Sequence, residues 1–324
     1  MITPMNVEIV VPVFNEEGNL EELYRQVVRE LEPLGVTFGF LFVDDGSRDR
    51  TVPILEQLRA KDSRVNFLSF TRNFGHQAAL LAGLEHSTGD CVVTMDGDLQ
   101  HPPQVVPALI RHWQQGSDIV VTTRDVGQSM GTLKRLATQG FYRLMNRISD
   151  LRVPPGAADF RLLDRRVIET IVAFPERQKF LRGLVSWTGF QTALVEYQVG
   201  TRHAGEVKYS LAKLIRLAWD GVTSFSAAPL RVAFYLGLGI VAISALYGMF
   251  ALVAYFTGHT PPGWTSVLVS VLAIGGLQMV FIGLIGEYLA RVFDEVKGRP
   301  LYLLKSQGAA RPRPPVRDEA DTRG

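Results

Sequence analysis

Residues 91–103 read CVVTMDGDLQHPP, an apolar run followed directly by an acidic turn. Other apolar, β-branched runs occur through the first half of the chain, and helix-like stretches separate them. Their hydrophobicity is continuous rather than alternating, which is typical of strands in a parallel sheet that is covered on both faces. We therefore expect an α/β domain with a mostly parallel sheet, whose strands cover Val7–Val13, Phe38–Val43, Val65–Phe70, Cys91–Met95 and Ile119–Thr122.

Polar clusters follow three of these strands. They are Pro12–Glu17 after the first strand, Asp44–Ser47 after the second and Asp96–Gln100 after the fourth. Ligands of parallel sheets bind at the carboxyl ends of the strands, so these clusters are candidate site residues. Any one acidic turn could simply cap the next helix, and this alternative is favoured for Glu17 and Asp49. Three clusters at one edge of the sheet predict a binding crevice.

The acidic turn carries two carboxylates, Asp96 and Asp98, with a glycine between them that permits a tight backbone. Gln100 adds a carbonyl oxygen close by. Oxygen ligands of this kind suit a hard divalent cation, so the turn predicts a Mg²⁺ or Mn²⁺ site. His76 and His101 flank the same crevice, but neither has a His or Cys partner at ligand spacing, which favours a structural role for both.

The composition excludes several classes of protein. A hydrophobic content of 47% with 20% charged residues is that of a folded chain, not of a disordered or fibrous one. Lys and Arg number 34 against 32 Asp and Glu, and this near-neutral balance argues against a nucleic-acid partner. The single cysteine, Cys91, excludes an intramolecular disulfide and a cysteine-based metal cluster, and it fits a reducing compartment.

Two long uncharged runs, Val232–Phe256 and Trp264–Gly286, lie near the end of the chain. Each is long enough to cross a hydrocarbon core of ~30 Å as a helix, so we expect two transmembrane helices. Arg231 precedes the first run and Arg291 follows the second, whereas the connector between them has no Lys or Arg. The positive-inside rule then places both ends in the cytoplasm. A buried helical hairpin of a soluble protein is the alternative.

These observations predict four parts of the chain. Residues 1–208 form a cytoplasmic domain without an evident signal peptide, and 231–290 form the two spans. Between them, residues 209–230 mix apolar, basic and aromatic side chains, which predicts amphipathic helices at the membrane surface; a soluble surface helix is the alternative. Residues 291–324 form a cytoplasmic C-terminal segment, whose tail from Lys305 onward lacks apolar periodicity and is expected to be disordered.

The motifs together resemble the family-2 glycosyltransferases of GT-A, Rossmann-like fold. The resemblance covers about residues 5–304 and rests on VPVFNEE at 11–17, DDGS at 44–47, DGDLQHPP at 96–103 and the paired spans. More narrowly, the chain is similar to polyprenyl-phosphate glycosyltransferases, a group that includes dolichyl-phosphate mannose synthases. Residues 156–165 and 229–231 look most like its bacterial glucosyl-type members, although Ala157 and Ala158 stand where those members have glycines.

The resemblance implies roles for the matching residues. The nucleotide sugar would contact Pro12, Phe14, Glu16, Asp44, Asp45, Asp96 and Arg124. The metal would bind Asp96, Asp98 and Gln100, and the catalytic carboxylates would be Asp98 and Asp159. The acceptor phosphate would bind Arg202, Lys208 and Ser210, with Arg124 facing either the donor phosphates or the acceptor. For the three basic residues, a solvated surface position is the alternative.

The activity implied is a metal-dependent, inverting transfer of glucose from UDP-glucose to undecaprenyl phosphate at the bacterial inner membrane. The implied partners are a UDP-sugar, the lipid acceptor and membrane lipids, and a homo-oligomer stays open. Mannose from GDP-mannose, or N-acetylglucosamine or amino-arabinose from UDP donors, are alternatives, as is a non-catalytic membrane scaffold. The acceptor phosphate has a second pKa near ~6 and is already a nucleophile at neutral pH, so Asp159 is either an orienting group or a base.

Overall fold

The computed structural model describes residues 5–124, 157–176, 179, 181–197, 228–258 and 263–308. The chain divides into two compact units. The first holds the α/β domain together with the chain from Arg299 onward, and the second holds two long helices. Residues 209–227 of the predicted interfacial segment lie outside the described residues, as do the predicted acceptor residues Arg202, Lys208 and Ser210. The last residues of that segment, 228–230, belong to the first long helix instead.

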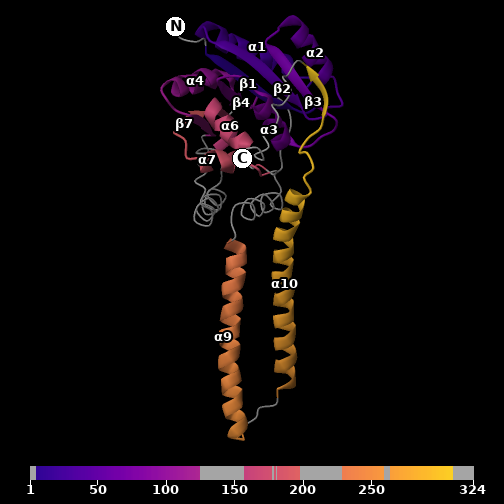
Figure 1. Cartoon of the computed structure of the whole chain (residues 1–324), viewed down its shortest axis with the longest axis vertical. Coiled ribbons are helices and arrows are strands. Elements are labelled where there is room, and N and C mark those ends of the chain that lie inside the picture. The colour runs from indigo at the N-terminus through magenta and orange to yellow at the C-terminus, as the bar shows by residue number, and fades with distance from the viewer. Residues whose placement is uncertain are drawn as a thin grey trace, which may run out of the picture. The chain divides into compact units, whose positions relative to one another are not determined.

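A mixed sheet forms the centre of the first unit (Figure 1). Over the described residues it has eight strands in the order β7-β5-β6-β4-β1-β2-β3-β8. The strands β1 to β4 are parallel, β6 runs antiparallel to β4 and β5, and β8 runs antiparallel to β3. The expected α/β fold is thus confirmed. The bounds are β1 Asn6–Val13, β2 Thr37–Asp44, β3 Val65–Phe70, β4 Cys91–Thr94, β5 Ile119–Arg124, β6 Ala157–Asp164, β7 Thr192–Tyr197 and β8 Leu304–Gly308.

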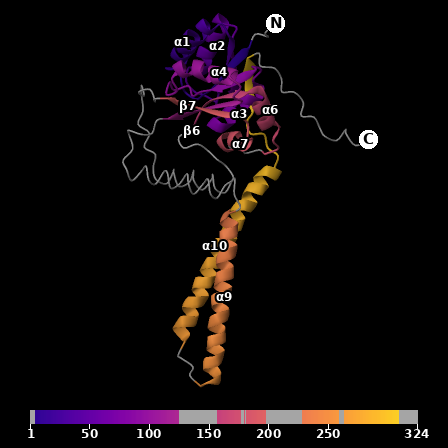
Figure 2. The ribbon, with the colours of Figure 1, turned by 90° about the vertical axis from the view of Figure 1, so that its left-hand side faces the viewer.

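Helices cover both faces of this sheet, as Figure 2 shows from the side. Alternate residues of β1 belong to different cores, because successive side chains of a strand point to opposite faces. Ile9 packs in the core beneath α1 (Leu20–Leu31), α2 (Thr51–Lys61) and α4 (Val106–Gln114). Val10 packs in the core beneath α3 (His76–His86), α6 (Arg165–Ala173) and α7 (Leu181–Trp187). Two short 3₁₀ turns, η1 (Glu32–Leu34) and η2 (Pro103–Val105), adjoin α1 and α4.

The sequence of α1 shows why such a helix forms and where it packs. Leu20, Leu23, Val27 and Leu31 recur at helical spacing and are fully buried. Each buried aliphatic side chain of this size contributes about 2 kcal/mol of transfer free energy. Acidic residues occupy the first turn and a basic residue the last turn, which complements the helix dipole.

The chain after the second long helix returns to the sheet. We expected disorder from Lys305, but β8 pairs with the edge strand β3, and Thr71 N donates to Leu303 O at 2.9 Å. The ring of Tyr302 stacks on Phe70 with centroids 4.9 Å apart, and its hydroxyl donates to Glu85 Oε2 at 2.6 Å. The expectation was wrong for residues 305–308 because pairing with an open sheet edge needs no local apolar periodicity.

The second unit contains α9 (Ala228–Phe256) and α10 (Trp264–Val296). Within them, Val232–Phe250 and Ile274–Val296 are long and apolar enough to cross a membrane. Their apolar side chains are largely exposed, unlike those of a core helix in a soluble protein. Near the end of α10, Arg291 Nη2 donates to Glu287 Oε1 at 3.2 Å, one turn apart on the helix. The two helices indicate membrane association.

Candidate active site

The loops after β1 and β2 are joined by hydrogen bonds at the carboxyl ends of these strands. The backbone N–H of Asn15 donates to Ser47 Oγ at 2.9 Å, and the N–H of Arg48 donates back to Asn15 Oδ1 at 2.9 Å. Glu17 and Asp49 each accept from the backbone of the other loop. The carboxylates of Glu17 and Asp49 therefore join the two loops, and this agrees with the structural role that the sequence favoured for them.

Two glycines permit a close approach of the other loops. A Cβ on Gly97 would lie 3.0 Å from Val13 Cγ1, so the absence of a side chain lets the acidic turn after β4 pack closely against the end of β1. Gly46 has φ +73°, and a Cβ there would lie 2.5 Å from the carbonyl carbon of Arg72. The loops after β1, β2, β3 and β4 therefore meet at one edge of the sheet.

Phe14 and Glu16 lie in the loop after β1, beyond the buried Pro12. The Phe14 side chain is 43% exposed, which is unusual for a large aromatic residue beside a core. Glu16 Oε2 accepts from Asn19 Nδ2 at 2.6 Å. Burial raises the pKa of Glu16, and the negative charges of Asp98, Asp49 and Asp96 add to this rise.

The adjacent residues Asp44 and Asp45 are both buried, and both carboxylates accept hydrogen bonds. Asp44 accepts from Ser69 Oγ at 2.6 Å and from the backbone of Ser47 at 2.9 Å. Asp45 accepts from the backbone N–H groups of Phe74 and Gly75, the residues just before α3. Asp45 thus holds the turn that positions α3, and its nucleotide contact stays a prediction.

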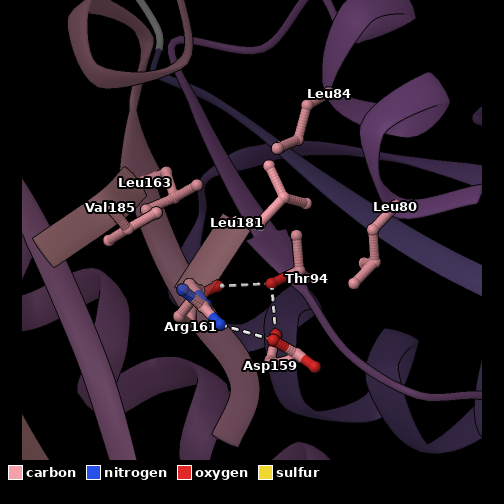
Figure 3. Close-up of a pocket in the computed structure, with 8 residues that line it drawn as sticks. All are labelled: Leu80, Leu84, Thr94, Asp159, Arg161, Leu163, Leu181 and Val185. Carbon is pink, nitrogen blue, oxygen red and sulfur yellow. Dashed lines mark hydrogen bonds and ion pairs between the residues drawn. The ribbon is translucent and has the colours of Figure 1, made fainter. Parts of the chain in front are cut away.

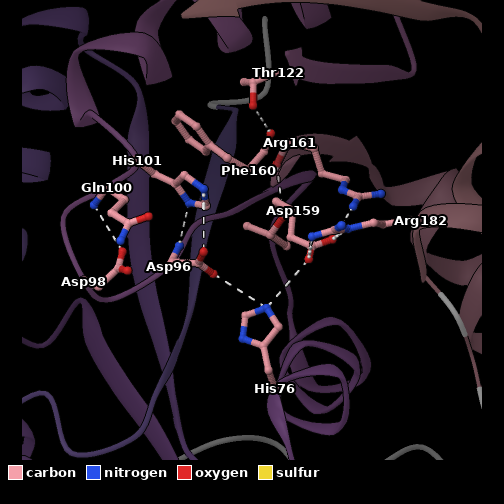
Figure 4. Close-up of polar contacts among 11 residues, drawn as sticks. His76, Asp96, Asp98, Gln100, His101, Thr122, Asp159, Phe160, Arg161 and Arg182 are labelled. Carbon is pink, nitrogen blue, oxygen red and sulfur yellow. Dashed lines mark hydrogen bonds and ion pairs between the residues drawn. The ribbon is translucent and has the colours of Figure 1, made fainter. Parts of the chain in front are cut away.

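The acidic turn after β4 is fixed by local hydrogen bonds (Figure 4). His101 Nδ1 accepts from the backbone N–H of Asp96 at 2.9 Å, and Asp98 Oδ1 accepts from the N–H of Gln100 at 3.1 Å. Leu99, which lies between Asp98 and Gln100, has φ +61°, a left-handed conformation that is rare for leucine. The ring of His101 is buried and stacks on Phe160 with centroids 5.0 Å apart.

His76, the first residue of α3, lies between two predicted site residues. Its Nε2 is 3.6 Å from Asp96 Oδ1 and 3.8 Å from Asp159 Oδ2. Burial lowers the pKa of His76, but the contact with Asp159 and the charges of both carboxylates outweigh burial and raise it. His76 therefore connects the acidic turn with the carboxylate on β6.

Asp159 on β6 is 5% exposed and is held by two arginines. Arg161 Nη2 donates to Oδ1 at 2.5 Å, while Arg182 donates through Nε to Oδ1 at 3.0 Å and through Nη2 to Oδ2 at 2.7 Å. Burial alone would raise the pKa of Asp159, but the bonds from His76 and Arg182 and the charges of both arginines hold it well below its ordinary value.

A small pocket adjoins this cluster (Figure 3). Arg161, which is buried, and Asp159 lie at one side of it together with Thr94, whose hydroxyl donates to the backbone carbonyl of Asp159 at 2.5 Å. The other lining residues are apolar: Leu80, Leu84, Leu163, Leu181 and Val185. An arginine in such surroundings needs a carboxylate partner, because a buried unpaired charge is strongly destabilising.

Family comparisons agree with the geometry. Residues 8–172 match the family model described as "Glycosyl transferase family 2", and residues 228–292 match the "GtrB C-terminal hairpin". The chain belongs to glycosyltransferase family 2. The resemblance drawn from the sequence is confirmed, and with it the enzyme class.

Two relatives match this family-2 glycosyltransferase over nearly its whole length. A bactoprenol glucosyl transferase of Shigella phage SfX is 45% identical over 94% of this chain and 100% of the relative. An SfII prophage-derived bactoprenol glucosyl transferase of Shigella flexneri is 44% identical over 95% of this chain and 100% of the relative. Among solved structures, a mannosyl-3-phosphoglycerate synthase from Rubrobacter xylanophilus is 18% identical over 72% of this chain and 75% of that one, with a TM-score of 0.47.

The acidic turn of this glycosyltransferase fits a divalent cation that is shared with a substrate. Among the described residues, no group of three or more His, Cys, Asp or Glu side chains could hold a metal. Mg²⁺, however, is commonly bound by one or two carboxylates together with substrate phosphates. Asp96 and Asp98 offer two such carboxylates. Burial is the main cause of the raised pKa of Glu16, and the negative charges of Asp98 and Asp96, which a cation would offset, add to it. The metal ligands stay a prediction that this chemistry supports.

Two residues of the glycosyltransferase site were not assigned from the sequence: Arg161 and Arg182. His76 was placed beside the crevice with a structural role favoured, and the structure adds its contacts with Asp96 and Asp159. Arg161 could have been found, because it stands two positions after Asp159 and so shares its face of β6. Arg182 lies on α7, and nothing local in the sequence connects it with Asp159. Arg124 is the last residue of β5, and its side chain is not described, so its predicted contact stays untested.

Proposed function

We propose that this family-2 glycosyltransferase transfers glucose from UDP-glucose to undecaprenyl phosphate, with inversion at the anomeric carbon. The observation that carries the proposal is the 45% identity to a bactoprenol glucosyl transferase over the whole length of that relative. This match includes the transferase domain and the C-terminal hairpin, so it covers the part that would bind the sugar donor and the part that would meet a lipid.

The donor would bind at the edge where the four loops meet. Phe14 presents an exposed ring on which a nucleobase can stack. Glu16 lies on the same loop, and Asp44 is the last residue of the neighbouring strand β2. Asp96, Asp98 and Gln100 would hold Mg²⁺ or Mn²⁺ against the donor diphosphate. When bound, this cation supplies Lewis-acid stabilisation of the charge that develops on the leaving diphosphate.

The return of the chain to the sheet supports the proposed membrane topology. The β8 strand belongs to the same folded unit as β1 to β7, although α9 and α10 lie between them in the sequence. A folded unit lies on one side of a membrane, so the chain must leave and re-enter on that side. Two spans satisfy this condition. With the positive-inside rule, they support a transferase domain in the cytoplasm of a bacterium and a multi-pass anchor in its inner membrane.

The acceptor phosphate would be bound by Arg202 and Lys208, just before the proposed interfacial segment 209–230, and by Ser210 at its start. Cations placed there would meet the phosphate of a lipid at the membrane surface. In this organisation, residues 1–208 form the transferase domain, 231–290 the spans and 291–324 the C-terminal segment, of which β8 belongs to the sheet.

The test is a transfer assay with the purified full chain in detergent. Undecaprenyl phosphate is incubated with radiolabelled UDP-glucose, UDP-N-acetylglucosamine, UDP-amino-arabinose or GDP-mannose, each with Mg²⁺ or Mn²⁺. We expect label in the lipid fraction from UDP-glucose alone. Label from another donor would show that the enzyme transfers a different sugar, and the proposed class of reaction would still hold. No label from any donor would overturn the proposed function and favour a non-catalytic scaffold.

A further inference from the structure

We infer that Asp159 is a positioning residue rather than the general base of the transfer, and that it acts by holding Arg182 and Arg161 at the reaction site. The inference rests on the proposed function for the identity of the acceptor. It concerns one carboxylate for which the sequence left both roles open, and it is carried by the contacts of that carboxylate.

The oxygens of Asp159 are already engaged. An ionised carboxylate offers about four acceptor positions. Three are filled by guanidinium donors, one from Arg161 and two from Arg182, and His76 Nε2 lies 3.8 Å from Oδ2 (Figure 4). A general base must instead present a free oxygen to the proton that it removes. The geometry is that of a carboxylate that organises cations.

The two arginines differ in exposure, and this difference suggests what each does. The Arg161 side chain is 6% exposed and lies beside the apolar pocket of Figure 3. The Arg182 side chain is 38% exposed, although its Nε and Nη2 atoms both bind Asp159. Asp159 thus offsets the buried charge of Arg161 and fixes the plane of the exposed guanidinium of Arg182. A guanidinium in a fixed plane is suited to binding phosphate oxygens.

The cluster is also connected to the acidic turn. His76 Nε2 lies within 4 Å of a carboxylate oxygen of both Asp159 and Asp96. The positively charged groups around Asp159 therefore lie next to the turn that would carry the donor diphosphate. Arg182, held on this side of the acidic turn, is placed to stabilise charge on phosphate oxygens without a proton transfer.

The chemistry does not require a base. The acceptor is a phosphate monoester with a second pKa of about 6, so above that pH it is a dianion. One of its oxygens forms the bond to the anomeric carbon while the bond from that carbon to the donor β-phosphate oxygen breaks. The dianionic monoester becomes a monoanionic diester, and the nucleoside diphosphate leaves as a trianion. Charge balances, and no proton moves.

A double-mutant cycle tests the inference. Asp159→Asn keeps the shape of the side chain, and Arg182→Gln removes the guanidinium. If Asp159 acts through Arg182, each variant lowers kcat by about 100-fold, and the double variant is within roughly threefold of the worse single variant. The control pair is Asp118→Asn and Arg166→Gln, an ion pair outside the site with N–O distance 2.5 Å and an exposed arginine, which should leave kcat unchanged.

The pH profile distinguishes a positioning residue from a general base. In the wild type and in Asp159→Asn, kcat/KM for the lipid should rise through the second ionisation of the phosphate and then level off. Two results would overturn the inference and make Asp159 a base. One is a double variant whose loss of kcat equals the product of the two single losses. The other is a rate of Asp159→Asn that keeps rising with hydroxide concentration.

The assay also separates this inference from the proposed function. If the wild-type protein transfers label to undecaprenyl phosphate from any sugar donor, the double-mutant cycle is measured with that donor. If the wild type transfers nothing, the proposed function fails, and the cycle is read instead from the thermal unfolding of the same four proteins in detergent. Non-additive shifts in Tm would then support the contact between Asp159 and Arg182, and additive shifts would overturn it.

Discussion

The Nδ1 atom of His101 accepts a hydrogen bond from the backbone N–H of Asp96 at 2.9 Å, and the same ring lies flat on Phe160. This buried ring fixes the start of the acidic turn from behind. It explains how a turn with leucine in a left-handed conformation keeps one shape. Residues that orient metal ligands in this way typically affect metal affinity by about 10- to 100-fold.

We therefore predict that His101→Phe weakens activation by Mn²⁺. Phenylalanine keeps the aromatic contact with Phe160 but cannot accept from Asp96, so the turn loses its anchor. The Mn²⁺ concentration for half-maximal activity should rise about tenfold or more. His112→Phe, at the end of α4 away from the acidic turn, is the control. An unchanged metal requirement in His101→Phe would show that the turn holds its shape without the histidine.

The metal ligands themselves give a second prediction. Asp98→Asn should lower kcat by about a thousandfold with the fold intact, because the charge on the leaving diphosphate loses its main stabilisation. Removal of divalent cations with EDTA should abolish wild-type activity, and added Mn²⁺ should restore it. Circular dichroism checks the fold of the variant. Near-normal turnover in EDTA would remove the metal from the mechanism.

The returning C-terminal segment gives a prediction about stability. Tyr302→Phe removes the hydrogen bond to Glu85 and should lower the free energy of unfolding by about 1 kcal/mol. Tyr302→Ala also removes the stacking on Phe70 and should cost about 3 kcal/mol. Thermal unfolding in detergent measures both. Equal stability of all three proteins would mean that this segment does not hold the sheet edge in solution.

Cys91 reports on the folding of the sheet. It lies in β4 and is fully buried, and burial raises the pKa of its thiol above the ordinary value. A thiol reagent such as DTNB should therefore leave native protein unlabelled at pH 8 and should label one thiol per chain after denaturation. Rapid labelling of the native protein would contradict the buried position of β4.

The five strands predicted from continuous apolar runs all form, because a strand buried on both faces must be apolar throughout. β6 was not predicted as a strand, since Asp159, Arg161 and Asp164 interrupt its apolar pattern. The first two charges are accommodated by pairing with each other and with Arg182, which belongs to another element. β8 was missed for a similar reason, because its partner β3 is more than 200 positions earlier in the chain. Contacts between distant segments leave no local periodicity to read.

The stereochemistry of the lipid product tests whether the acceptor phosphate displaces the nucleoside diphosphate in a single step. A single displacement by the acceptor phosphate inverts the anomeric carbon, so the α-linked glucose of UDP-glucose must become β-linked. The measurement is NMR of the anomeric carbon and proton in undecaprenyl product made by the wild type from ¹³C-labelled UDP-glucose. We expect a β-glucosyl phosphodiester. An α-linked product, or labelled glucose that never enters the lipid, would contradict it.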